Sequence, residues 1–175
     1  MLPSDGAPER KDIEQIMPPP ERLAKGPVAV IECFQEIPCD PCHTSCPKGA
    51  ILPFENINDL PKINFDACDG CSLCVAACPG LAIFVVDYTY SDDLALLKLP
   101  HEFVPLPRKD EIVKLLNREG EMVAEGRVVK VIRFKDKTNV VWVECPKELA
   151  MDVRAIAPPA YEEDNELRKL VNTGG

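Results

Sequence analysis

Cysteine is the residue type in this chain that could do chemistry. Eight of its nine cysteines lie between Cys33 and Cys78, and the ninth, Cys145, stands apart. The later part of this segment is a regular run in which three cysteines recur at every third position and a fourth precedes a proline: Cys68, Cys71, Cys74 and Cys78. Three thiolates at this spacing let one short loop reach three corners of a compact inorganic group, while the fourth reaches a second group. The run therefore predicts 4Fe-4S cluster ligation.

The earlier part of the segment is less regular. It contains Cys39, Cys42 and Cys46, the last again followed by a proline, but Glu36 stands where a regular run would place another cysteine. Cys33 lies three residues before that position. We predict that Cys33 supplies the missing ligand through a longer loop.

Eight thiolates then divide between two clusters. The predicted ligands of cluster 1 are Cys33, Cys39, Cys42 and Cys78. The predicted ligands of cluster 2 are Cys46, Cys68, Cys71 and Cys74. The crossed ligation brings the clusters close together, as an electron relay requires. Residues 46–51 echo residues 78–83, which indicates an internal duplication. Gly70 is expected to let the backbone approach a cluster closely.

Zinc, disulfides and a partial cluster are the alternatives. Structural zinc also uses cysteine pairs, but it requires neither three cysteines at steps of three nor a proline after each fourth cysteine. If Cys33 were only a buried strand residue, cluster 1 would be incomplete, contain three irons or be absent. Residues 1–20 lack the apolar core of a signal peptide, so we expect a cytoplasmic protein whose thiols stay reduced.

The charge of the chain limits its partners. The formal net charge is -9 and the sequence pI is about 4.8, which argues against nucleic acid and against anionic membrane surfaces. No segment reaches the roughly 18 apolar residues that span a bilayer. We therefore expect neither a nucleic-acid nor a membrane partner.

The other reactive or bulky side chains carry weaker signals. Cys145 is expected to be a buried inert thiol, and Trp142 to belong to a core. His43 is expected to be a solvated loop residue, although it could instead tune a cluster by a hydrogen bond. His101 is expected on a linker surface. Lys48 is either an ordinary surface lysine or a cation near a cluster.

The hydrophobic pattern divides the chain into five regions. Residues 1–27 are a Pro-rich, extended arm, and 28–90 hold the cysteines between strands at 28–33 and 82–88. Residues 91–107 are a linker with helical turns over 92–99. Residues 108–156 form a small β-rich domain with strands at 111–116, 121–124, 127–134 and 139–145, a turn at 136–138 and a short helix after Pro146. Residues 157–175 are a polar tail.

Residues 28–88 resemble the bacterial two-cluster ferredoxins, on the strength of the two cysteine runs. More narrowly, residues 32–51, with the spacing Cys33-x5-Cys39, are similar to the small iron–sulfur subunit of multi-subunit FAD-dependent dehydrogenases. Residues 141–156 are similar to the same subunits. The resemblance implies an α+β chain: a ferredoxin-like two-cluster 4Fe-4S domain, then a small β-rich, barrel-like domain, with extended termini.

The resemblance also implies a role. In such enzymes a flavin on a partner subunit oxidises an amino acid or amine, such as proline, sarcosine or an opine, and single electrons leave through the clusters. The sequence has no nucleophile–base pair, phosphate loop or dinucleotide motif, so we expect an electron-transfer subunit without its own catalytic site. The alternatives are a free soluble ferredoxin, a subunit of another oxidoreductase, a zinc-stapled interaction module and a stand-alone enzyme.

Overall fold

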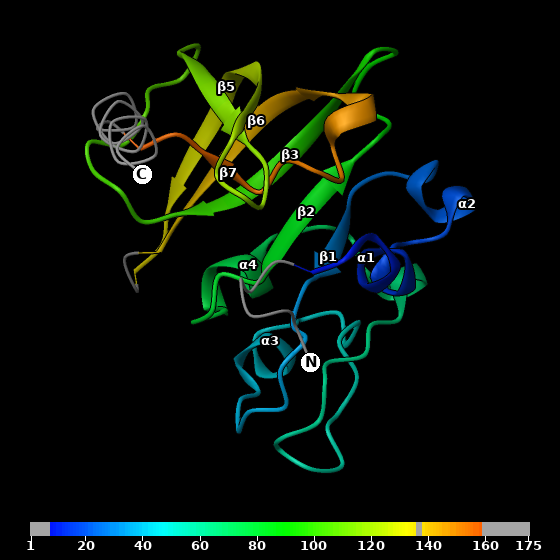
Figure 1. The fold of residues 1–175 in the computed structure, drawn as a ribbon. Helices are drawn as coiled ribbons and strands as arrows, with labels where there is room; N and C mark the ends of the chain where they lie inside the picture. Colours follow the sequence, from blue (N-terminus) through cyan, green and yellow to red (C-terminus); the bar gives the residue numbers. More distant parts are fainter. Residues whose placement is uncertain (1–7, 136–137, 159–175) are drawn as a thin grey trace, which may run out of the picture.

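A single antiparallel sheet dominates the computed structural model, which describes residues 8–135 and 138–158 (Figure 1). The strands are β1 (Val28–Ile31), β2 (Ile83–Asp87), β3 (Leu94–His101), β4 (Ile112–Leu116), β5 (Met122–Arg133), β6 (Asn139–Pro146) and β7 (Ala155–Ile156). The helices are short: α1 (Arg10–Ile16), α2 (Pro20–Leu23), α3 (Pro41–Thr44), α4 (Leu73–Ala77) and the 3-10 turns η1 (Phe65–Ala67) and η2 (Lys147–Leu149). Within the described ranges, no helix has the length and apolar character needed to cross a membrane.

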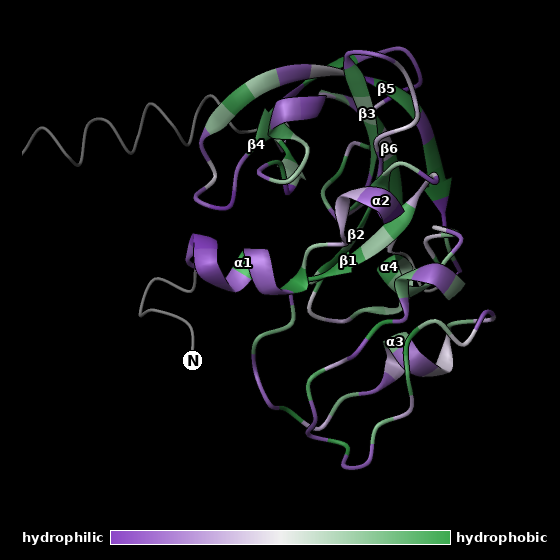
Figure 2. Cartoon of the chain, turned by 90° about the vertical axis from the view of Figure 1, so that its right-hand side faces the viewer, coloured by the Kyte–Doolittle hydropathy of each residue, from purple (hydrophilic) through white to green (hydrophobic). Residues whose placement is uncertain are grey.

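The sheet has the strand order β1-β2-β3-β6-β5-β4-β7 and is open, with β1 and β7 at its edges. It curls, because one core contains Val28 from the first edge strand together with Leu115 of β4 and Ile156 of the last strand. The strong curvature of β5 is visible in Figure 2. The predicted strands are confirmed, with residues 121–124 and 127–134 joined into the single strand β5. The predicted turn at 136–138 falls partly on residues 136–137, which lie outside the described residues.

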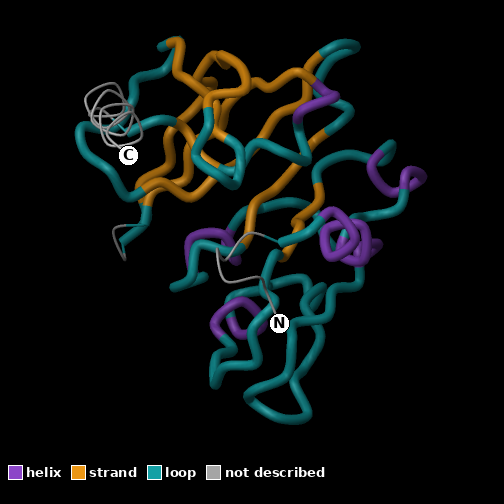
Figure 3. Tube along the Cα trace, in the orientation of Figure 1, coloured by secondary structure: helices purple, strands orange, loops and turns teal. Residues whose placement is uncertain are grey.

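Strands β1 and β2 separate the sheet's core from the cysteine region. Val28 and Val30 of β1 belong to the core under the curled sheet, whereas Ala29 and Ile31 pack on the opposite face against cysteines and helix α4. A strand buried on both faces reads as a continuous apolar run, which is how this strand stands out in the sequence. The cysteine segment below it consists mostly of loops (Figure 3).

The linker with helical turns, predicted over residues 91–107, is wrong in its first part. Residues 94–101 form β3, which pairs with both β2 and β6 in the middle of the sheet. Their leucines suit either a helix or a strand, and pairing on both sides decides for the strand. Pro100 is tolerated because the pairing with β2 ends at Lys98, so no ladder hydrogen bond is lost on that side.

The N-terminal arm is not extended where the structure describes it. Residues 10–16 and 20–23 are helical, and Pro20 occupies the first position of α2, which suits proline. Ile13 is buried, and Ile16, Met17 and Leu23 pack against the sheet's core. The arm therefore belongs to the folded body. Residues 1–7 and the predicted tail beyond residue 158 lie outside the described residues.

The fold is thus a mixed one in which a seven-stranded open sheet carries the cysteine loops. The sheet runs without a break from β1, beside the cysteines, through β6 and β5 to β7. The division of the chain into a two-cluster domain and a separate barrel-like domain stays a prediction.

Candidate metal centre

The cysteine loops are held by two short helices. Pro41 begins α3, which carries Cys42, and α4 carries Cys74. Ser72 precedes α4 with a left-handed backbone (φ 71°) and is almost fully buried. That sharp reversal allows the loop to turn directly into the helix, so Cys71 and Cys74 lie on the same side of the loop.

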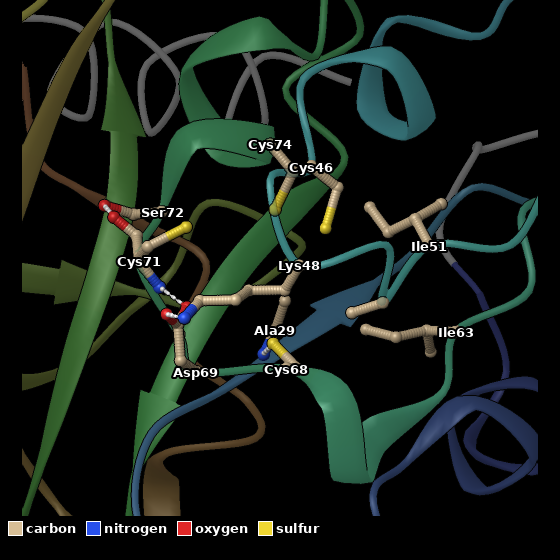
Figure 4. A pocket seen from close by; sticks show the side chains of 12 residues that line it. Ala29, Cys46, Lys48, Ile51, Ile63, Cys68, Asp69, Cys71, Ser72 and Cys74 are labelled. Carbon is tan, nitrogen blue, oxygen red and sulfur yellow. Dashed lines mark hydrogen bonds and ion pairs between the residues drawn. The ribbon is translucent and has the colours of Figure 1, made fainter.

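One hollow is lined by four thiols: Cys46, Cys68, Cys71 and Cys74. Figure 4 shows their sulfur atoms around a common space. Ala29, Ile51 and Ile63 supply apolar walls. These four cysteines are the set that the sequence predicts for cluster 2, and we call this space the second hollow.

Another hollow is lined by the other four: Cys33, Cys39, Cys42 and Cys78. Its walls are also largely apolar and include Ile31, Phe54 and Ile83. These cysteines are the set predicted for cluster 1, and we call this space the first hollow. Cys46 of the first run lines the second hollow, and Cys78 of the second run lines the first hollow. This exchange of the two cysteines that precede prolines is what crossed ligation requires.

The donors in the two hollows suit an iron–sulfur group better than a single ion. Over the described ranges, no three His, Cys, Asp or Glu side chains are gathered closely enough for one metal ion. The backbone N–H groups of Ala29 and Ala82 point at the sulfurs of Cys68 and Cys78, each at 3.4 Å. Such bonds stabilise thiolate charge and are a recognised influence on cluster potentials.

Burial favours the protonated form of the two most buried thiols that line the hollows, those of Cys74 and Cys42. It raises the pKa of Cys74 to about 12 and that of Cys42 to about 11, and the charge of neighbouring cysteines adds to both shifts. A metal group that takes these thiolates must displace their protons. Apolar walls and high thiol pKa values therefore favour a group that brings its own positive charge.

Gly70 lines the second hollow, where its close approach to a cluster stays a prediction, and it also has a packing role. Its φ of +65° is left-handed, and a Cβ atom built on it would stand 2.6 Å from the Cβ of Pro27. The residue that crowds Gly70 is thus the one before β1. Glycine here lets the loop between Cys68 and Cys71 pack against the chain that enters the sheet.

Arg22 is a residue that sequence reasoning missed. It is buried, and its guanidinium donates hydrogen bonds to four carbonyls: those of Phe65 (2.7 Å), Cys68 (2.6 Å), Gly26 (3.0 Å) and Pro27 (2.9 Å). Helix α2 thereby holds the start of the second cysteine run beside β1. A lone arginine in a Pro-rich arm gave no signal of this contact.

A partly buried ion triad holds the start of the first run. Glu32, directly before Cys33, accepts hydrogen bonds from Arg118 and Arg154, each at 2.6 Å. Burial alone would raise the pKa of Glu32, but the two guanidinium groups bring it below its ordinary value. Arg154 also stacks on Phe84, 3.7 Å from the ring centroid. The triad ties the cysteine segment to the far end of the sheet.

The weaker predictions have mixed outcomes. Cys145 is buried and away from both hollows, as expected, and its thiol donates to the carbonyl of Pro146. Lys48 lines the second hollow and pairs with Asp69 at 3.4 Å, so it is a cation beside the predicted cluster. His101, expected on a surface, is instead buried, and burial lowers its pKa.

His43 is also less exposed than predicted. Its Nδ1 lies 2.8 Å from the carbonyl oxygen of Ile51, and its ring meets Phe54 edge-on. These contacts fix the first cysteine loop against the segment that follows it. No sulfur contact of His43 is needed to explain its place.

Comparisons with known proteins agree with this geometry. The sequence pattern of the 4Fe-4S binding domain family matches residues 61–84, which contain the whole second cysteine run. Those residues form a ferredoxin-type 4Fe-4S binding domain. The resemblance to 4Fe-4S proteins of the ferredoxin type is thus confirmed for this segment.

Two relatives extend the comparison. Over 47 residues the chain is 45% identical to the pyruvate synthase subunit PorD of Methanocaldococcus jannaschii, which is 27% of this chain and 52% of that one. Over 56 residues it is 43% identical to the ferredoxin-type protein NapF of Haemophilus influenzae, 31% of this chain and 32% of that one. The chain thus spans about half and about a third of these relatives. No solved structure matches.

Proposed function

We propose that the chain is an electron-transfer subunit that holds two 4Fe-4S clusters. Cluster 1 is bound by Cys33, Cys39, Cys42 and Cys78, and cluster 2 by Cys46, Cys68, Cys71 and Cys74. The single observation that carries the proposal is the grouping of eight cysteines into two hollows in these two sets of four. Spacing alone suggested the sets, and the fold brings the members of each set together.

The protein's own residues prepare both sites for this work. A 4Fe-4S cluster accepts and passes on one electron at a time. The walls of the hollows are largely apolar, and the N–H groups of Ala29 and Ala82 donate to ligand sulfurs. Arg22 and Glu32 fix the segments that begin the two runs. A rigid polar frame of this kind reduces the rearrangement that accompanies each change of charge.

The partner that we propose is an FAD-dependent dehydrogenase that oxidises an amino acid or amine. The support is the resemblance of residues 32–51 to the small subunits of such enzymes, including the long spacing from Cys33 to Cys39. In this assembly the chain would take electrons from the partner's flavin. The sheet beyond the cysteine loops offers a surface for docking that a free ferredoxin has no need of.

The match to PorD favours a second candidate of the same kind. PorD is a subunit of a pyruvate synthase, so this chain could serve an oxidoreductase acting on a 2-oxo acid. Both candidates use the chain identically and differ only in the partner. Anaerobic purification of the tagged chain from its native host separates them: a co-purifying flavoprotein that reduces the chain with an amine or amino acid supports the first. Pyruvate-dependent reduction without flavin supports the second, and a chain isolated alone contradicts both.

The ligand assignment has its own test, in which Cys145 supplies the control. Serine at Cys33 should remove iron from cluster 1 and serine at Cys71 should remove iron from cluster 2, because each takes away one of four ligands. Serine at Cys145 replaces a buried thiol outside both hollows and should leave the iron content unchanged. An unchanged iron count in C33S would show that Cys33 is not a ligand.

A further inference from the structure

A row of side chains crosses the sheet beside the second hollow. In the strand register Val85 of β2 lies opposite Lys98 of β3, Lys98 lies opposite Trp142 of β6, and Trp142 lies opposite Lys130 of β5. Val85 and Trp142 pack with the cysteine-side core. The row is therefore on the face of the sheet that the cysteine loops cover.

Lys98 is the unusual member of this row. It is only 6% exposed, although lysine is almost never buried without a partner. Its ammonium donates a hydrogen bond of 2.5 Å to the carbonyl oxygen of Gly70, inside the second cysteine run between Cys68 and Cys71. A strand that lies outside the cysteine segment thus delivers a buried amine to the loop that holds cluster 2.

Several groups oppose the effect of burial on Lys98. Burial lowers the pKa of Lys98, and the negative charges of Asp87, Asp69 and the cysteines at 68 and 71 counteract that shift only in part. The Nζ atom also lies 4.1 Å from the centroid of the Trp142 ring, a cation–π contact. With the carbonyl of Gly70, the amine has two partners that prefer an ammonium to a neutral amine.

The described contacts of Trp142 are made by the face of its ring and not by its indole N–H group. Its Nε1 is buried and finds no hydrogen-bond partner among the described residues. The ring lies between Lys98 and the exposed Lys130, whose Nζ is 5.1 Å from the centroid. The indole therefore covers the amine of Lys98 and separates it from solvent, at the expense of an unpaired N–H group.

We infer that Lys98, held by Gly70 and shielded by Trp142, is a positioning residue that raises the reduction potential of cluster 2 relative to cluster 1. The inference rests on the proposed function, since it requires a cluster on Cys46, Cys68, Cys71 and Cys74. Gaining an electron adds one negative charge to the cluster and its thiolates. A positive charge kept out of water stabilises that added charge far more than an exposed one does.

Among the described residues, the first hollow has no buried cation bonded to its cysteine loop. Its nearby cations, Arg118 and Arg154, share the carboxylate of Glu32, and Arg118 also lies 3.9 Å from Asp152. Beside the second hollow Lys48 pairs with Asp69, and Asp87 opposes the charge of Lys98, but Lys98 is a buried ammonium bonded to the loop itself. The electrostatic difference between the hollows therefore favours electron residence on cluster 2, which would order the transfer from cluster 1 to cluster 2.

The test is a redox titration of the cluster-loaded chain, followed by electron paramagnetic resonance. Each cluster takes one electron from a reduced viologen mediator, which is oxidised, and no bond is made or broken. Lys98→Met keeps the length of the side chain and removes its charge. Its expected effect is about a tenfold shift of one reduction equilibrium toward the oxidised cluster, or about 59 mV for one electron. The C71S chain, whose second cluster is altered, identifies which wave this is.

Two further variants make the result specific. Trp142→Phe should lower the midpoint potential of the same wave by a smaller amount, because water then reaches Lys98. Lys130→Met removes an exposed charge from the same row and should move neither wave by more than about twofold, since exposed charges are screened. Iron content and thermal unfolding of each variant confirm that the fold and both clusters persist.

The outcomes separate the inference from the function on which it rests. The inference is supported if the unmodified chain shows two reduction waves and K98M lowers the midpoint potential of the cluster 2 wave alone. Two waves that K98M leaves in place, or lowers equally, overturn it while the electron-transfer function stands. A chain that binds no iron overturns both.

Discussion

Arg22 offers the sharpest test of how the N-terminal helices support the cysteine loops. Its guanidinium is buried and bonds the carbonyls of Gly26, Pro27, Phe65 and Cys68. Hydrogen bonds to charged groups contribute about 1.5–3 kcal/mol each. Counting only two of the four, because water can reach the part-buried carbonyls, gives a loss of about 3 kcal/mol when Arg22 becomes methionine.

This loss can be measured by anaerobic urea unfolding of the cluster-loaded chain. Trp142, the only tryptophan, reports on the sheet by fluorescence, and visible absorbance reports on the clusters. With a urea dependence of about 2 kcal/mol per M, R22M should lower the midpoint by about 1.5 M. The cluster absorbance should be lost at or before the fluorescence change, because Arg22 holds the loop at Cys68.

The matched control is Arg10→Met. Arg10 is exposed on α1, and within the described ranges its ion pair is with Glu14, one turn along the helix. Such a pair contributes less than about 0.5 kcal/mol, so the midpoint should stay within about 0.3 M of the unmodified chain. If R22M behaved like R10M, the four hydrogen bonds would contribute nothing net and the reasoning about the arm would be refuted.

Two other variants probe the cysteine loops and the triad. Glu32→Gln leaves two partly buried arginines without their carboxylate and should lower the free energy of unfolding by about 2–3 kcal/mol at neutral pH. The pKa of Glu32 is lowered in the folded chain, so its contribution to stability is present above the ordinary value of 4.5 and is lost as the pH falls further. The difference in urea midpoint between E32Q and the unmodified chain should therefore shrink at acid pH. An equal difference at pH 7 and at acid pH would contradict this. Gly70→Ala forces a Cβ into Pro27 at a left-handed φ and should cost about 3 kcal/mol and deplete iron from cluster 2. Gly80→Ala, where a Cβ meets nothing within 4 Å, should change midpoint and iron little, and equal effects of the two alanines would refute the packing argument.

Much of the sheet could be predicted from hydrophobic pattern alone. Strands β1, β2, β5 and β6 are rich in β-branched residues, and their runs end at turn residues. Strand β3 could not be predicted in this way, because its leucines at 94, 96, 97 and 99 fit a helix as well as a strand. Only its two neighbours, one of them β6 from far along the chain, make it a strand.

The cysteine sets could be proposed from spacing, because ligand spacing reflects the size of the cluster that the loop must enclose. The groups that support the cysteines could not. Glu32 meets Arg118 and Arg154 across separations of 86 and 122 residues, and Lys98 meets Gly70 across 28. Isolated charged residues of this kind look like ordinary surface residues in a sequence until the fold buries them.

A reductive titration of the anaerobically prepared chain, combined with iron and sulfide analysis of the same sample, tests most directly whether eight thiolates hold two electron-accepting clusters. We expect a brown protein with roughly eight irons and eight sulfides that takes up about two electrons per chain. A folded, colourless protein that contains zinc or no metal and accepts no electrons would contradict it.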